Sequence, residues 1–428
     1  MPQIEYFKDL NLDQLNFNNN DAVNDQEIVT KVQKIITDIK KLGDKALFSY
    51  SKKFDDYDLG KNPIKFTKSE IKQAALDLNP KLYNALKKAQ QRIATYHKKQ
   101  LPKNIRFKDE DGLEVGWRWY PLESVGIYVP GGLAAYPSSV LMTATIAQIA
   151  GVKQVQIAMP CPGGKYSKAV LAAAELCGIT DIYKIGGAQA VAAFAHGTES
   201  VEPVVKIVGP GNAYVATAKK LLYGEVGIDS IAGPSEILVL ADNSASVQHV
   251  AYDLLSQAEH DKAAKAFLIT DSKALAEQVI AAVEMILPSL DRQDITATSW
   301  KNNARIFVVN DLAKQGVLLA NKIAPEHLEI IAKDPESYVP HITTAGALFL
   351  GKYTTESVGD YLAGPSHVLP TSGTAKFSSG LSILDFLRRS SVIDCSKEAF
   401  ANIADTAEIL ALEEGLECHA RAITIRKS

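Results

Sequence analysis

Cysteine is scarce in this chain. Its four cysteines, Cys161, Cys177, Cys395 and Cys418, are widely spaced, and no CxxC pair occurs. Such usage fits reduced thiols in a cytosolic protein better than a disulfide framework. We therefore predict that the four cysteines are structural.

An excess of positive charge and a long apolar run are both absent. Lys and Arg number 46 against 49 Asp and Glu, so the composition offers no surplus to neutralise a nucleic-acid backbone. No apolar run approaches the ~20 residues of a membrane span, and the first residues lack the basic-then-apolar order of a signal peptide. We expect no nucleic-acid partner, no membrane partner and a cytoplasmic location.

The sequence does contain short apolar runs that alternate with helix-like stretches. Segments 25–57 and 67–100 are charged and helical in period, and the second opens on the capping-box pattern Thr67-Lys68-Ser69-Glu70. The strand-like runs are Val125–Val129, Gln154–Met159, Asp181–Ile185, Val204–Val208, Ile237–Ala241, Ala266–Thr270 and Arg305–Val309. This alternation predicts an α/β fold with mainly parallel sheets and helical cover.

The length predicts more than one domain, since a single core stops growing near ~250–300 residues. A break near Ile231–Ser235 divides the strands into two α/β units. We predict an N-terminal arm (1–24), a first unit (25–123 with 236–365), a second unit (124–235) and a small C-terminal segment (366–428). That last segment contains a predicted helix at Glu398–Glu414 and a strand-like tail at Ala420–Arg426.

Three glycine-rich turns follow apolar runs: Pro130-Gly131-Gly132, Gly186-Gly187-Ala188-Gln189 and Gly209-Pro210-Gly211-Asn212. Backbone amides at such strand-to-helix turns can receive a phosphate. None completes G-x-G-x-x-G, because Tyr214 stands at the sixth position of the motif when Gly209 is counted as the first. On these residues alone, nucleotide-binding loops and ordinary tight turns are equally good interpretations.

A carboxylate stands beside an imidazole in Ala324-Pro325-Glu326-His327. A carboxylate can activate water, and an imidazole can accept a proton near neutral pH. Most such pairs lie on solvated surfaces by chance, and alone this pair favours that interpretation.

Four further residues form a candidate metal site. Gln257 and His260, spaced i,i+3 in a helical stretch, can project from one face. Asp360 and His419 would complete an N/O set of four that suits zinc. No spacing rule selects Asp360 or His419 over other residues, and glutamine is an unusual ligand, so the residues alone favour structural roles over metal binding.

Taken together, the motifs resemble those of the histidinol dehydrogenase family, in order and spacing, from about Asp25 to Arg426. The matching runs are Val125–Gly132, Lys184–Ala190, Ile207–Asn212, Ala232–Glu236, Leu255–His260 and Ala324–His327. The resemblance implies that histidinol is oxidised through histidinaldehyde to histidine, the final steps of histidine biosynthesis, with two NAD reduced. It further implies one zinc ion per subunit and a homodimer in which residues 366–428 contribute to the partner's site.

The resemblance also assigns residues, with the metal and catalytic groups in the first α/β unit and the NAD loops in the second. Its zinc ligands match Gln257, His260, Asp360 and His419, with the substrate's nitrogens completing the coordination. Substrate contacts match Ser235, Gln257, His260, His327, Asp360, Glu414 and His419. NAD contacts match Tyr128, Gln189 and Asn212. His327 is expected to act as the base, and Glu326 to activate water for the aldehyde step.

Three positions depart from the family's usual pattern: Leu133, Ser366 and Arg421. They affect substrate or cofactor positioning rather than the reaction, and His367 is expected to line the pocket.

A cysteine thiohemiacetal route has no supporting motif. Two other classes stay open: a zinc-dependent hydrolase with Glu326 as base, and a metal-binding or assembly protein without turnover. Reduction of NAD by histidinol discriminates among the three.

Overall fold

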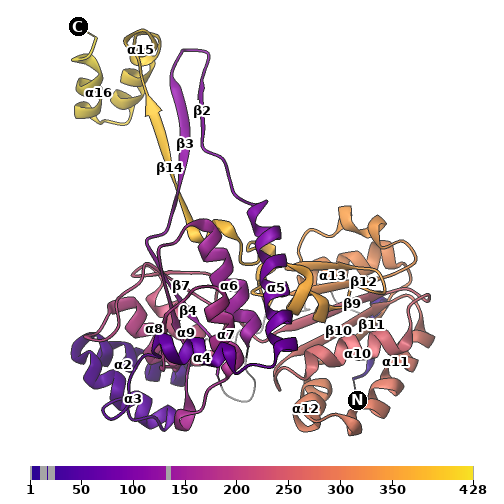
Figure 1. Cartoon of the computed structure of the whole chain (residues 1–428). Coiled ribbons are helices and arrows are strands. Elements are labelled where there is room, and N and C mark those ends of the chain that lie inside the picture. The colour runs from indigo at the N-terminus through magenta and orange to yellow at the C-terminus, as the bar shows by residue number, and fades with distance from the viewer. Residues whose placement is uncertain (1, 10–16, 18–24, 132–135, 428) are drawn as a thin grey trace.

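Two lobes, each built on a parallel sheet, carry a long projecting arm (Figure 1). The computed structural model describes residues 2–9, 17, 25–131 and 136–427. The α/β fold predicted from the alternating pattern is confirmed. Leu133 and most of the predicted arm at 1–24 lie outside the described residues.

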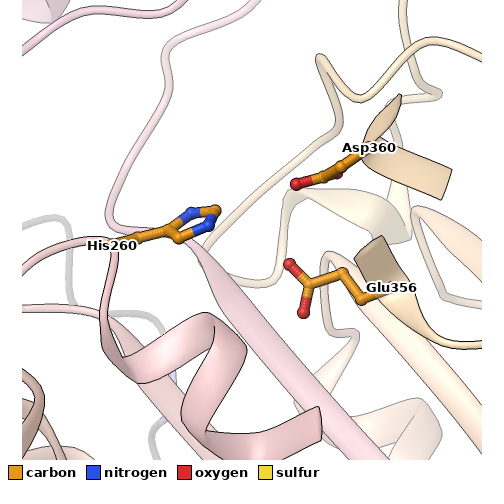
Figure 2. A group of neighbouring side chains, drawn as sticks. All are labelled: His260, Glu356 and Asp360. Atoms are coloured by element: carbon orange, nitrogen blue, oxygen red, sulfur yellow. The ribbon is translucent and has the colours of Figure 1, made fainter. Parts of the chain in front are cut away.

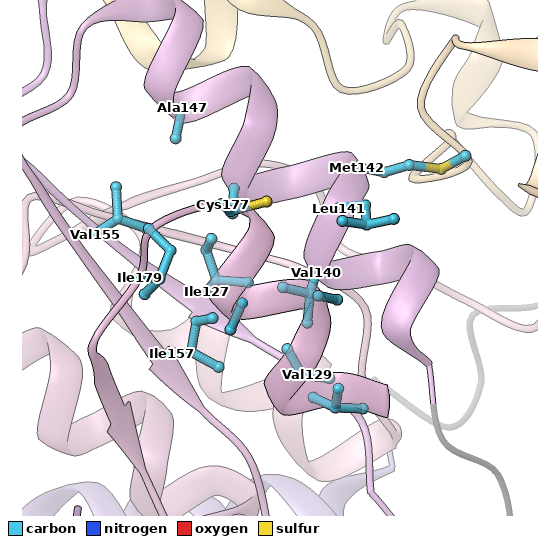
Figure 3. Close-up of a cluster of buried hydrophobic side chains, with 14 of the residues drawn as sticks. Ile127, Val129, Val140, Leu141, Met142, Ala147, Val155, Ile157, Cys177 and Ile179 are labelled. Atoms are coloured by element: carbon cyan, nitrogen blue, oxygen red, sulfur yellow. The ribbon is translucent and has the colours of Figure 1, made fainter. Parts of the chain in front are cut away.

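The first lobe contains a five-stranded parallel sheet in the order β6-β5-β4-β7-β8. Its strands are β4 (Ser124–Tyr128), β5 (Gln154–Ala158), β6 (Asp181–Tyr183), β7 (Lys206–Val208) and β8 (Gly227–Ile228). The crossover helices are α6 (Pro137–Ala150), α7 (Lys168–Leu176), α8 (Gly187–His196) and α9 (Ala213–Leu222). Figure 3 shows the core between β4, β5 and α6, where Ile127, Ile157 and Val140 are fully buried. Burial on this scale contributes ~1.5–3 kcal/mol for each large apolar side chain.

Four N-terminal helices pack on the crossover helices of this sheet: α2 (Gln26–Leu42), α3 (Asp44–Asp55), α4 (Lys68–Leu76) and α5 (Pro80–Lys98). The helical segments predicted at 25–57 and 67–100 are confirmed, and the Thr67–Glu70 capping box forms. Apolar faces of these helices join the cores around β4 and α8. Core packing thus groups residues 25–98 with 124–228, which differs from the predicted grouping with 236–365. The order of elements along the chain does not show this grouping, because the four helices come before the five-stranded sheet in the sequence.

The second lobe contains a six-stranded parallel sheet in the order β1-β11-β10-β9-β12-β13. Its strands are β1 (Ile4–Tyr6), β9 (Glu236–Ala241), β10 (Lys265–Thr270), β11 (Arg305–Val308), β12 (His327–Ile331) and β13 (Ala347–Leu350). The longer helices of this lobe are α10 (Val247–Ala258), α11 (Lys273–Ile286), α12 (Gln293–Asn303) and α13 (Val317–Ile323). A short helix, α14 (Glu356–Val358), runs directly into a π turn, η6 (Gly359–Ala363). The sequence did not predict β1, β12 or β13.

An antiparallel sheet forms the shaft of the arm, in the order β14-β3-β2. Its strands are β2 (Ile105–Lys108), β3 (Glu114–Pro121) and β14 (Leu387–Asp394), so residues far apart in the chain lie side by side. Two helices, α15 (Lys397–Glu413) and α16 (Glu417–Thr424), lie at its tip beyond the lobes (Figure 1).

The structure of the arm tip confirms one predicted helix and corrects one predicted strand. The helix expected at Glu398–Glu414 is present as α15. The strand-like tail expected at Ala420–Arg426 is wrong, because most of these residues belong to α16. Ala420 is the buried residue of α16, and this helix packs on α15 rather than into a sheet. No helix in the described ranges has the length and apolar character needed to cross a membrane.

Candidate active site

Glu326 and His327 lie where a loop enters the middle of the six-stranded sheet. Helix α13 ends at Ala324 in the left-handed region (φ 52), and β12 begins at His327 beside β9. His327 is 3% exposed and Glu326 is 5% exposed. A solvated surface pair is therefore excluded, and both side chains need internal partners.

The His327 ring presents an unprotonated nitrogen. Its Nδ1 lies 3.0 Å from the carbonyl oxygen of Glu236, which can only accept, so Nδ1 carries the proton. Nε2 then carries a lone pair that can accept a proton. This atom is buried and has no hydrogen-bond partner among the described residues. It lies 4.0 Å from Asp360 Oδ1. Burial lowers the pKa of His327 to about 4, although the Asp360 charge acts in the opposite direction. The ring is neutral near pH 7 and can accept a proton.

The same backbone segment orients Glu326. Its Oε2 accepts a 3.0 Å hydrogen bond from the Glu236 N–H. Burial raises the pKa of Glu326 well above its ordinary value, although this hydrogen bond acts in the opposite direction. A carboxylate of raised basicity is a better proton acceptor from water than an exposed one.

Three ligand-type side chains converge beside this pair. Atoms of His260, Glu356 and Asp360 all lie within 4.8 Å of one another, and Figure 2 shows His260 facing the two carboxylates. His260 follows the end of α10, whereas Glu356 and Asp360 come from the α14–η6 turn. Imidazole with carboxylates is a donor set that suits zinc or a similar divalent ion.

Gln257 supports a metal or polar ligand at this place. It lies in the last turn of α10 and is 0% exposed, and among the described residues neither its Oε1 nor its Nε2 has a hydrogen-bond partner. A buried amide without partners is costly, and a bound group would remove the cost. The residues present therefore fit a divalent metal ion.

Sequence reasoning missed Glu356. Its side chain is buried, and its Oε1 lies 3.6 Å from His327 Nδ1. Burial raises its pKa well above the ordinary value, and the neighbouring Asp360 charge adds to this. The i,i+4 spacing of Glu356 and Asp360 was the available signal, since that spacing places two carboxylates on one helical face.

His367 and Ser139 complete the wall on the Asp360 side. His367 Nδ1 lies 3.8 Å from Asp360 Oδ1, and its Nε2 lies 3.1 Å from Ser139 Oγ. Ser366, one of the positions that depart from the family pattern, is buried and accepts from the Val368 N–H at 3.2 Å. Ser235 lies immediately before β9, where its carbonyl accepts from the Lys265 N–H.

Glu414 and His419 are not brought to this site within one chain. Glu414 ends α15 and His419 lies on α16, both exposed at the arm tip and away from the lobes (Figure 1). They line an open, mostly apolar groove of about 680 Å³ between the two helices, together with Cys418. Arg421, another departing position, pairs with Glu417 on the solvent side of α16.

Tyr128, Gln189 and Asn212 lie at the carboxyl edge of the five-stranded sheet. The Tyr128 hydroxyl, at the end of β4, accepts from the Gly187 N–H at 3.1 Å, two residues before the buried Gln189. Asn212 follows β7 and caps α9, since its Oδ1 accepts from the Tyr214 and Val215 N–H groups. The strand order reverses between β4 and β7, where open α/β sheets bind nucleotides.

The turn after β7 is held from both sides. Gly209 donates its N–H to Asp229 Oδ2 at 2.7 Å and accepts from Lys219 Nζ at 3.1 Å, while Lys219 and Asp229 form a buried ion pair. Gly209 has φ +107, and a Cβ there would stand 2.2 Å from the Tyr128 carbonyl oxygen. The turn is thus rigid and glycine-dependent, as a backbone approached closely by a ligand would require.

A neutral buried base beside a possible group of metal ligands, in a protein whose other parallel sheet has a nucleotide-type switch point, is typical of an oxidoreductase of the α/β class. A family model described as histidinol dehydrogenase matches residues 18–427. The chain belongs to the histidinol dehydrogenase family, which confirms the resemblance of its motifs.

Individual relatives cover nearly the whole chain. The histidinol dehydrogenase of Rhodospirillum rubrum is 48% identical over 401 residues, which are 94% of this chain and 92% of that protein. Histidinol dehydrogenase 1 of Nostoc sp. is 49% identical over 395 residues, 92% and 91% of the two chains. The crystal structure of histidinol dehydrogenase from Elizabethkingia anophelis has a TM-score of 0.91 at 35% identity and covers 99% of this chain and 98% of that one.

Proposed function

We propose that this protein oxidises L-histidinol through L-histidinaldehyde to L-histidine with NAD, using one zinc ion per subunit. The observation that carries the proposal is the buried, neutral His327 ring, whose proton is fixed on Nδ1 by the Glu236 carbonyl so that Nε2 faces Asp360 as a base. Family membership identifies the substrate that such a base would act on.

Zinc and NAD would each supply part of the chemistry when bound. Zinc would be held by Gln257, His260 and Asp360, with a fourth ligand from His419, and would orient the substrate's imidazole and amine. NAD, bound at the carboxyl edge of the five-stranded sheet, would accept hydride from the reacting carbon. Tyr128, Gln189 and Asn212 are the proposed cofactor contacts, and the Asn212 cap leaves its Nδ2 available to donate.

The chain's own residues move the protons. His327 Nε2 takes the hydroxyl proton as the alcohol carbon loses hydride, because the alkoxide-like oxygen is otherwise too unstable in a buried site. Glu326 accepts a proton from the water that adds to the aldehyde. His327 then deprotonates the hydrated aldehyde before the second oxidation. The remaining substrate contacts are proposed to be Ser235 and, from the arm, Glu414.

A covalent thiol route is disfavoured by the cysteines themselves. Burial raises the pKa of Cys161 to about 12 and that of Cys177 to about 11, so neither supplies a thiolate at neutral pH. Cys395 and Cys418 are exposed on the arm rather than beside His327. The water-activating role of Glu326 is the better supported path for the aldehyde step.

The assay that tests the function is NADH absorbance on mixing the protein with histidinol, NAD and zinc. We expect two NADH per histidinol consumed, and histidine as the product. His327→Asn is the matched control, because it keeps an N–H donor for the Glu236 carbonyl without a basic nitrogen. A zinc-dependent hydrolase or a metal-binding protein without turnover would form no NADH, and that outcome would reject the proposal.

We further propose a homodimer in which each arm completes the partner's site. The arm tip offers an apolar groove with exposed Leu410 and Leu416, and it carries the two predicted site residues that a single chain leaves apart. A second copy that packs on this groove would bury the apolar surface and bring His419 toward His260.

Mixing two inactive variants tests this exchange. We expect His260→Asn and His419→Asn proteins, each inactive alone, to regain activity when their subunits are exchanged, since a mixed dimer contains one intact site. Mass spectrometry confirms exchange, and a mixture of His260→Asn with itself is the control. Mixed dimers without activity would show that each site is built from one chain.

A further inference from the structure

Glu329 lies where three site-bearing elements meet. It is two residues after His327 on β12, so both side chains point to the same face of the strand. Its side chain is 1% exposed, and its Oε1 accepts a 2.5 Å hydrogen bond from the Glu356 N–H. The proposed reaction uses His327 but assigns nothing to Glu329.

Helix α14 depends on this bond for its position. Thr355 stands at its N-cap position, but its side chain makes no capping hydrogen bond to the described helix. Glu329 therefore takes over a free N–H that an N-cap normally satisfies. The α14–η6 turn is short, and it carries both Glu356 and Asp360.

Asp253 extends the contact to the third element. It lies one helical turn before Gln257 on α10, and its carboxyl adjoins that of Glu329. Burial raises the pKa of Glu329 to about 9, and the nearby Asp253 charge adds to the rise. Glu329 therefore lies between α10 and the α14–η6 turn.

We propose that Glu329 is a positioning residue that ties α10, β12 and the α14–η6 turn together, and so sets the distance between His260, Asp360 and His327. This inference rests on the proposed function, since the metal is what the tied elements would hold. Cutting the tie would leave α14 without a cap acceptor and would free the two carboxylates to move from the His260 side.

The test is zinc affinity of metal-free protein, measured by competition with a chromophoric chelator and independent of turnover. Glu329→Leu removes the acceptor for the Glu356 N–H and the carboxyl beside Asp253, and we expect zinc to bind ~10–100-fold more weakly, as for the loss of other groups that orient metal ligands. Glu329→Gln keeps an acceptor for the Glu356 N–H and gains a donor toward Asp253. We expect it to bind zinc nearly as tightly as the parent protein.

Controls separate this role from general destabilisation. Leu240→Ala, in the core at the other end of β9, should lower the melting temperature without weakening zinc binding. The Asp253→Ala variant removes only the contact of Glu329 with α10 and should also weaken zinc binding. It therefore tests the proposal even if the Glu329→Leu protein does not fold. Unchanged affinity in Glu329→Leu or Asp253→Ala, or equal loss in the Leu and Gln variants of Glu329, would overturn the inference. A parent protein that binds no zinc would instead reject the proposed function.

Discussion

Replacing His327 by Asn is expected to slow both oxidation steps by ~10²–10⁴-fold, the usual loss when a general base is removed. The reason is geometric: Nε2 is free because Nδ1 donates to the Glu236 carbonyl. Asparagine can still donate to that carbonyl but presents no basic nitrogen toward Asp360. Single-turnover NADH formation, started separately from histidinol and from histidinaldehyde, measures the two steps.

The Glu326→Gln variant should affect the two oxidation steps unequally, whereas His327→Asn should slow both of them. Only aldehyde oxidation needs activated water, so this variant should slow histidinaldehyde oxidation more than histidinol oxidation. The glutamine amide still offers an oxygen to the Glu236 N–H, so the local fold is retained. Near-normal rates for His327→Asn, with equal loss in both steps for Glu326→Gln, would contradict the assigned roles.

Metal removal is expected to abolish turnover. The site brings together the His260 imidazole, two carboxylates and a buried amide with no hydrogen-bond partner, and without a cation the two carboxylates repel each other in a buried place. Prolonged treatment with a strong chelator should give inactive apoprotein that zinc or manganese restores. Metal analysis must accompany the assay, because a tightly held ion can survive dialysis.

A variant gives an independent check of the metal ligands. His260→Asn should lower metal occupancy as well as activity, since the loss of one ligand from a small set weakens binding strongly. An exposed histidine outside the site, His249, supplies the control: His249→Asn should keep the parent's metal content. Full activity in protein verified to contain no metal would remove zinc from the mechanism.

The sequence predicted most of the sheet framework because buried parallel strands are continuous apolar runs. Ile237–Ala241 and Ala266–Thr270 correspond closely to β9 and β10. β12 escaped prediction because it begins with His327 and contains Glu329, two ionisable residues in a fully buried strand. The ionisable residues of the candidate site interrupt the apolar run of β12, so a search for apolar runs does not find this strand.

Local sequence also predicted some site geometry. Gln257 and His260 do lie together at the end of α10, because their spacing is a property of one helix. The tail at Ala420–Arg426 went wrong, since a short apolar pattern does not distinguish a helix from a strand without its packing partner, here α15.

The sequence by itself determined the family, through ordered motifs, and the α/β class, through the periodicity of its apolar residues. Only the tertiary structure decided that Glu356 joins His260 and Asp360, that Glu236 orients the side chains of Glu326 and His327, and that the arm carries Glu414 and His419 away from the lobes. The physical reason is that these contacts join elements distant in the chain. Their proximity comes from sheet order and the direction of the arm, which no local pattern of residues encodes.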